Sequence, residues 1–201
     1  MAKLKAPLLS LGASGAIGKS IVFFGWKGLN VAREYVIPAN PRTDPQTTQR
    51  GYLTTMVDRV HSAQADGTHP LTAADISAYA LWAAVVKAAT TWFNQVVKNG
   101  IDQLVAGLRE AIFSSGTTTP GTDELDVAVW TLGIPPTDGY FYYGTSRTAL
   151  IRRAAATCAS GEASATITGL VTGTKYFWQF VPTAPDTIVG TKSGIYYGVP
   201  L

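Results

Sequence analysis

Cysteine and histidine are scarce in this chain, which has one cysteine, Cys158, and two histidines, His61 and His69, in 201 residues. A single cysteine excludes a disulfide within one chain. Neither histidine has a cysteine or an acidic cluster at the short spacing that metal ligands need. Cys158 has no histidine near it in the sequence to activate it as a nucleophile. We therefore assign no catalytic residue, metal site or cofactor, and we predict that the protein is not an enzyme.

Charge is also scarce, since charged residues make up 14% of the chain, against roughly 25% in typical soluble domains. A surface with so few charges must be covered by Thr, Ser, Gly, Ala and aromatic residues, which favours faces that are partly buried against neighbouring chains. The net charge is +3, and the basic excess lies early in the chain. These basic residues form no continuous run, so nucleic acid is not a favoured partner.

Long apolar runs are absent as well. The apolar stretch after Lys3 and Lys5 is too short for a signal peptide, and no later run reaches the length of a membrane span. We therefore expect no membrane partner, and we expect synthesis in a cytoplasm.

The front segment, residues 14–50, carries the clearest local pattern. Gly15 and Gly18 predict a turn, and two strands are predicted around the connection Lys27-Gly28-Leu29. The predicted strands are Ile21–Trp26 and Asn30–Pro38. A capping box then predicts a helix from Thr43 to about Gln64, since Thr43 is followed three residues later by Gln46.

Residues 13–20 also fit a loose phosphate-loop pattern, with Lys19 and Ser20 at its end. Such a loop must open a helix, because the helix N-terminus helps to hold the phosphates. The residues that follow, Ile21–Phe24, are β-branched and aromatic and predict a strand. The pattern therefore favours a glycine turn, and a nucleotide-binding protein is the least favoured alternative.

The rest of the chain changes from helical to strand periodicity. A second capping box, Thr72 with Asp75, predicts a helix that stops near Asn99-Gly100, and a third helical run covers Ile101–Phe113. The composition of residues 114–123 predicts a linker, and alternating short strands follow it. We predict a two-part α+β chain: a hairpin and helical anchoring domain over 1–113, a linker over 114–123 and a β-sandwich over 124–201.

Residues 124–201 resemble a fibronectin type III domain, an immunoglobulin-like sandwich. Val127–Trp130 is similar to its second strand, which ends in the core tryptophan, and Asp138–Tyr143 is similar to its third. The most specific match is Leu170 with Gly173-Thr174 and Tyr176. The resemblance implies that the Tyr176 hydroxyl caps the strand crossover.

The front half resembles the opening module of proteins encoded in the virion gene clusters of tailed phages. The match covers roughly residues 12–60, and its residues are Ser14-Gly15, Gly18, Gly25–Asn30, Arg33, Asn40–Thr43, Gln46 and Arg50. The resemblance implies a structural virion component present in multiple copies, with capsid, portal, neck or tail subunits as partners. A capsid-associated (decoration) or neck location is favoured over a tail location.

These patterns give a set of candidate interface residues and leave their role open. The candidates are Trp26, Lys27, Asn30, Arg33, Asn40, Arg42 and Arg50. The three arginines either brace the hairpin against the following helix or dock on an acidic patch of a neighbouring subunit.

An alternative function is a tail-associated or surface-binding module that recognises host glycan or protein. About half of the sandwich tyrosines are expected to point outward. These tyrosines are Tyr140, Tyr142, Tyr143, Tyr196 and Tyr197.

Overall fold

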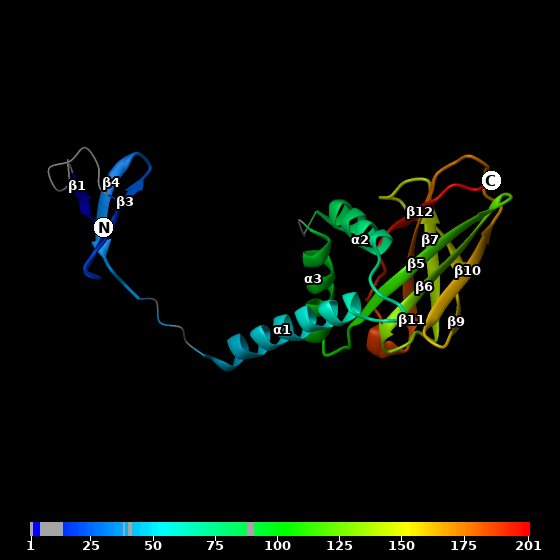
Figure 1. The fold of residues 1–201 in the computed structure, drawn as a ribbon, viewed down its shortest axis with the longest axis horizontal. Coiled ribbons are helices and arrows are strands. Elements are labelled where there is room, and N and C mark those ends of the chain that lie inside the picture. The colour runs from blue at the N-terminus through cyan, green and yellow to red at the C-terminus, as the bar shows by residue number, and fades with distance from the viewer. Residues whose placement is uncertain (1, 5–13, 38, 40–41, 88–90) are drawn as a thin grey trace. The chain divides into compact units, whose positions relative to one another are not determined.

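The chain forms two compact units, Met1–Thr43 and Asp44–Leu201. The structure is a computed structural model that describes residues 2–4, 14–37, 39, 42–87 and 91–201 (Figure 1). No helix in these ranges is long and apolar enough to cross a membrane.

The first unit is a four-stranded antiparallel sheet of order β1-β4-β3-β2. Its strands are β1 (Ala2–Leu4), β2 (Gly15–Ile17), β3 (Ile21–Trp26) and β4 (Leu29–Glu34). The predicted hairpin is confirmed, although β4 begins one residue earlier than predicted and ends at Glu34. Lys27 and Gly28 join the strands with φ of 50° and 76°, the positive values that tight two-residue hairpin turns require.

The second unit begins with three helices, which lie together beside the sheets in Figure 1. They are α1 (Asp44–Gln64), α2 (Ala73–Val86) and α3 (Trp92–Val105). The predicted capping box of α2 is confirmed, with Thr72 and Asp75 each bonding the backbone of the other. The predicted end of α1 is confirmed as well.

The predicted helix stop at Asn99-Gly100 was wrong, because both residues lie inside α3. Gly100 is needed for close packing: a Cβ atom there would lie 2.1 Å from Cε of the buried Met56 on α1. The glycine thus marks a close approach of two helices. The third helix predicted over Ile101–Phe113 was also wrong, since α3 ends at Val105 and Ala111–Phe113 begin a strand.

Two antiparallel four-stranded sheets complete the unit, with orders β5-β6-β10-β9 and β12-β11-β7-β8. The first contains β5 (Ala111–Gly121), β6 (Glu124–Gly133), β9 (Thr157–Ala159) and β10 (Glu162–Thr168). The second contains β7 (Asp138–Gly144), β8 (Arg152–Ala155), β11 (Tyr176–Ala184) and β12 (Tyr196–Gly198). One cluster holds Phe113 and Val127 of the first sheet with Phe141, Trp178 and Phe180 of the second, an arrangement compatible with a β-sandwich.

The linker predicted over residues 114–123 was wrong. Ser114–Gly121 belong to β5, which pairs with β6 from Ala111↔Gly133 to Gly121↔Glu124, with an irregularity between Ser114 and Thr117. Three consecutive threonines, Thr117–Thr119, lie in this strand, and β-branched residues favour strands. The division of the chain therefore falls after Thr43, and the helices and both sheets share one unit.

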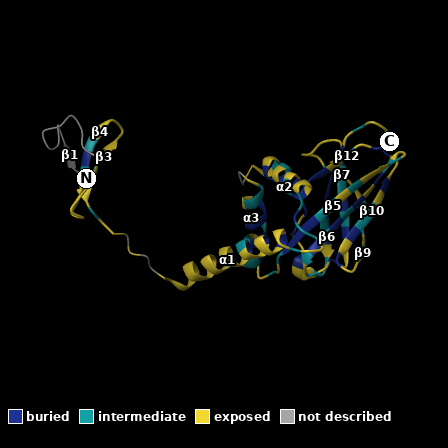
Figure 2. Ribbon diagram, in the orientation of Figure 1, coloured by how far each residue is buried: buried dark blue, intermediate teal, exposed yellow. Residues whose placement is uncertain are grey.

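A second hydrophobic cluster joins the helices to the sheets. It includes Met56 and Val60 of α1, Tyr79 and Trp82 of α2, and Ile112 of β5. Only the C-terminal half of α1 takes part, because Leu53 is 48% exposed whereas Met56 is 1% exposed. Figure 2 shows this change from an exposed to a partly buried helix along α1.

Trp130 was predicted to be the core tryptophan, and this was wrong. Along β6 the residues Val127 and Val129 are buried, so the half-buried Trp130 points to the opposite face, where it stacks on His69 with ring centroids 3.7 Å apart. The fully buried tryptophan is Trp178 of β11. The predicted tyrosine contact is present, because the Val171 amide donates to Oη of Tyr176 at 3.1 Å.

Candidate interaction surface

The sheet of the first unit has two faces, and strand pairing decides which residues share each one. Paired residues in an antiparallel sheet project to the same side. Trp26 pairs with Leu29, and Phe24 pairs with Val31, so these four side chains share one face, which we call the tryptophan face. Ile21 pairs with Ile17 on the opposite face.

Apolar side chains on this sheet remain largely open to solvent. Trp26 is 54% exposed, Leu29 46%, Ile17 50% and Ile21 45%. Among the side chains described in residues 14–37, Val31 alone is buried. Exposed apolar side chains gathered on a small sheet are typical of a surface that another chain covers.

Two of the predicted interface residues lie at the turn of the hairpin, and a third lies on its tryptophan face. Trp26 ends β3 and Lys27 occupies the turn. Arg33 pairs with Val22 and therefore shares the tryptophan face, where its guanidinium lies 5.4 Å from the centroid of the Phe24 ring. This cation–π contact holds a positive charge against the apolar surface.

The other candidates lie elsewhere. Asn30 pairs with Gly25 and so belongs to the opposite face. Arg42 is exposed beyond β4, Arg50 is exposed on α1 of the second unit, and Asn40 lies outside the described residues. The structure thus places Trp26 and Lys27 at the turn of the hairpin and Arg33 near the opposite end of the same strands, and it places Arg50 in the second unit.

The first unit carries an excess of basic residues. Residues 1–43 contain six basic residues and a single acidic residue, Glu34, whereas residues 44–201 contain ten basic and twelve acidic residues. The two units therefore carry opposite net charges. A positive unit with an apolar face fits an acidic protein surface.

The segment with the phosphate-loop pattern folds as a hairpin. Gly15–Ile17 form β2, and Gly18 and Lys19 turn with φ of 55° and 54°. The Ser20 amide donates to the Ile17 carbonyl at 2.9 Å, and β3 follows. The predicted glycine turn is confirmed, and the segment leads into a strand where a phosphate loop would lead into a helix.

In the second unit, a buried carboxylate joins three elements. Asp75 of α2 is 0% exposed, and its oxygens accept bonds from the amides of Thr72, Ser115 and Gly116 at 2.7–2.9 Å. The Thr72 hydroxyl donates to Asp75 at 2.7 Å, and Tyr196 Oη donates to it at 2.6 Å. Sequence reasoning found the contact with Thr72 and missed the others, because they come from residues 40 to 121 positions away.

Two tyrosines near this carboxylate are buried with it. Burial raises the pKa of Tyr196 well above its ordinary value, and the nearby Tyr79 and Asp75 raise it further. Burial also raises the pKa of Tyr79, whose hydroxyl donates to the Phe113 carbonyl at 2.9 Å. Both phenols therefore stay neutral and act as structural hydrogen-bond donors.

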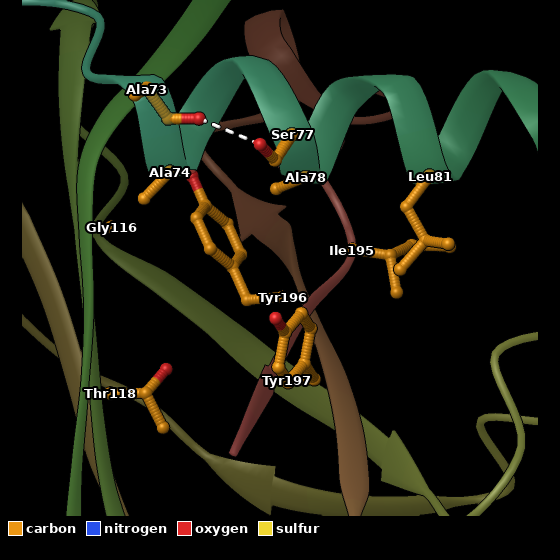
Figure 3. Close-up of a pocket in the computed structure, with 10 residues that line it drawn as sticks. All are labelled: Ala73, Ala74, Ser77, Ala78, Leu81, Gly116, Thr118, Ile195, Tyr196 and Tyr197. Atoms are coloured by element: carbon orange, nitrogen blue, oxygen red, sulfur yellow. Dashed lines mark hydrogen bonds between the residues drawn. The ribbon is translucent and has the colours of Figure 1, made fainter.

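A cavity of about 500 Å³ lies between α2, β5 and β12 (Figure 3). Three of its four hydroxyl groups have hydrogen-bond partners, and the fourth belongs to Tyr197. Ser77 donates to the Ala73 carbonyl at 2.9 Å, Thr118 accepts from Trp178 Nε1 at 2.9 Å, and Tyr196 is bonded to Asp75. The remaining lining is mainly small or apolar, so this cavity offers little to orient a polar ligand.

The other reactive side chains do not assemble into a centre. Burial raises the pKa of Cys158, with Asp138 adding to the shift, which disfavours the nucleophilic thiolate. Among the residues that the structure describes, no group of three or more His, Cys, Asp or Glu side chains is placed to hold a metal ion. No known protein family, curated protein or solved structure matches the chain.

Proposed function

We propose that this protein is a structural, non-enzymatic component of a tailed-phage virion, capsid-associated or in the neck. In this proposal the first unit anchors the chain to other virion proteins, and the second unit projects an immunoglobulin-like sandwich. The observation that carries the proposal is the tryptophan face, where Trp26 and Leu29 stay about half exposed on a positively charged sheet.

The anchoring role follows from the energetics of a small sheet. A sheet with one buried apolar residue among its described side chains gains little stability from its own core. A neighbour that covers Trp26 and Leu29 would gain about 25 cal/mol for each Å² of apolar surface removed from water. Lys27 in the turn and Arg33 on the tryptophan face favour a neighbour with acidic side chains.

Two features of the second unit support the immunoglobulin-like part of the proposal. Taking β5 to β12 as strands A, B, C, C′, D, E, F and G, the sheet β5-β6-β10-β9 has the order ABED. The sheet β12-β11-β7-β8 then has the order GFC with C′ at its edge. Tyr176 stands at the start of strand F and bonds the backbone upstream, as in a tyrosine corner.

The test is incorporation into phage particles. We expect the wild-type chain in purified intact particles, and we expect Trp26→Ala combined with Arg33→Ala to lower its copy number at least about tenfold, the effect of losing about 1.4 kcal/mol of docking free energy. Val171→Ala in the second unit, at a residue 63% exposed, is the matched control and should enter normally. Absence of the wild-type chain from intact particles would overturn the proposal.

A further inference from the structure

A second cavity, of about 400 Å³, opens on the second unit beside the β7–β8 loop. Its lining comes from four elements that are distant in sequence. The lining residues are Leu81 of α2, Thr145, Ser146 and Arg147 of the loop, Lys175 and Phe177 at the start of β11, and Tyr197 of β12.

We propose that this cavity binds an anionic sugar, a pyranose that carries a carboxylate. This inference goes beyond the anchoring role proposed above and does not depend on it. It rests on two cations, two aromatic rings and a hydrogen-bonded loop, all of which line this cavity.

The charges of the cavity are all of one sign. Arg147 and Lys175 line it, and no acidic residue does. Within the described part of the chain, the ion pairs join Arg59 to Glu110 and Lys98 to Asp102, so neither cavity cation has a carboxylate partner there. An arginine and a lysine that line one cavity without a carboxylate partner suit an anionic ligand.

The aromatic rings place the lysine and provide a stacking surface. Lys175 Nζ lies 3.6 Å from the centroid of the Tyr197 ring and 5.4 Å from that of Phe177. These contacts hold the ammonium group at the ring surface. Tyr197 is 56% exposed, and both rings line the cavity, so a pyranose that enters it meets aromatic side chains, which are apolar partners for its C–H groups.

The loop that carries Arg147 is held by hydrogen bonds among its own residues. Ser146 Oγ and Thr148 Oγ1 lie 3.0 Å apart, and the Ala149 amide donates to the Ser146 carbonyl at 3.2 Å. Gly144 lets the loop fold back, because a Cβ atom there would lie 2.3 Å from the Ala149 carbonyl oxygen. A loop that is ordered in advance loses less entropy on binding.

The experiment is a calorimetric or NMR titration of the full chain with D-glucuronate, D-glucose and acetate. Glucuronate offers both the carboxylate and the sugar face, whereas glucose and acetate each offer one. We expect saturable binding of glucuronate with a Kd of roughly 1 mM, and binding at least about fivefold weaker for the other two. Absence of saturation by glucuronate up to about 50 mM would overturn the proposal. Equal affinity for acetate would overturn the sugar assignment.

Variants locate the site. Lys175→Ala and Arg147→Ala should each weaken glucuronate binding at least about fivefold. Tyr197→Ala should weaken both glucuronate and glucose. The matched controls are Lys192→Ala and Arg152→Ala, which remove exposed basic residues outside the cavity lining and should leave binding unchanged. Equal losses in the controls would show that the anion binds by diffuse charge and would overturn the site.

Discussion

At the scale of single residues, Asp75 is the side chain with the most structural consequences. Its carboxylate satisfies three backbone amides and two hydroxyls that belong to the start of α2, to β5 and to β12. A buried acceptor with five donors holds distant elements in one arrangement. Any movement that separates a donor from the Asp75 carboxylate costs that donor its hydrogen-bond partner.

We therefore expect Asp75→Ala to lower the free energy of unfolding by about 3 kcal/mol or more, since it leaves one buried and four partly buried donors without this acceptor. Asp75→Asn should lower it by less, about 1–3 kcal/mol, because one oxygen is retained. Asp58→Ala, at an exposed position on α1, is the control and should change it by less than about 0.5 kcal/mol. Urea unfolding measures all three, and a loss under about 1 kcal/mol for Asp75→Ala would contradict the role given to this carboxylate.

Local patterns predicted some of these residues and missed others for a physical reason. The capping role of the Tyr176 hydroxyl was expected from the resemblance to a fibronectin type III domain, and its partner, the Val171 amide, lies five positions away. Trp130 was misplaced because successive residues of a strand point to opposite faces, and an assignment shifted by one position exchanges the two sides. The alternation in β6 was visible, but the side that faces the second sheet depends on β11 and its Trp178, which are remote in sequence.

At the scale of elements, the two glycines inside helices have opposite roles. Among the described residues, no atom outside the surrounding helix backbone lies within 4 Å of the position that a Cβ would take at Gly51 of α1, whereas at Gly100 of α3 that position lies 2.1 Å from Met56 Cε. The first glycine only weakens its helix, and the second allows α1 and α3 to approach.

Gly51→Ala should therefore raise the free energy of unfolding by about 0.5–1 kcal/mol, the usual gain in helix propensity. Gly100→Ala should lower it by about 1 kcal/mol or more, because Met56 is 1% exposed and has little free space to move into. Thermal unfolding of the two variants beside the wild type measures the difference in sign. A stabilising Gly100→Ala would mean that α1 and α3 pack less closely than described.

Elements with short-range signals were predicted well, and those that depend on remote partners were not. The hairpin of the first unit follows from Lys27-Gly28 between two β-rich runs. Strand β5 was taken for a helix end and a linker because its Ser, Thr and Gly content resembles a flexible segment. It is a strand because β6 supplies its hydrogen-bond partners from Ala111 to Gly121. The residue types of β5 alone do not indicate that pairing.

At the scale of the whole molecule, the chain consists of two units of different physical character. The second unit contains two hydrophobic clusters, one around Phe141 and Trp178 and one around Met56 and Trp82. The first unit has a basic excess and exposed apolar side chains. One unit thus has the core of an independent fold, and the other has the exposed apolar surface that we propose as the docking element. The candidate surface was predictable from its residue types, but its division into two faces required the strand register.

This division predicts how a truncated chain behaves. Residues 44–201 should fold without residues 1–43, because both hydrophobic clusters consist of residues after Asp44. The Tm of the truncated chain should stay within about 3 °C of that of the full chain. For a domain of this size, such a difference corresponds to about 1 kcal/mol or less of unfolding free energy. Calorimetry of the full and truncated chains measures this.

The same truncated chain should fail to enter phage particles while the full chain enters. A truncated chain that unfolds at a much lower temperature would show that the sheet stabilises the second unit, and one that is stable and still incorporated would place the anchor in the helices or the sandwich.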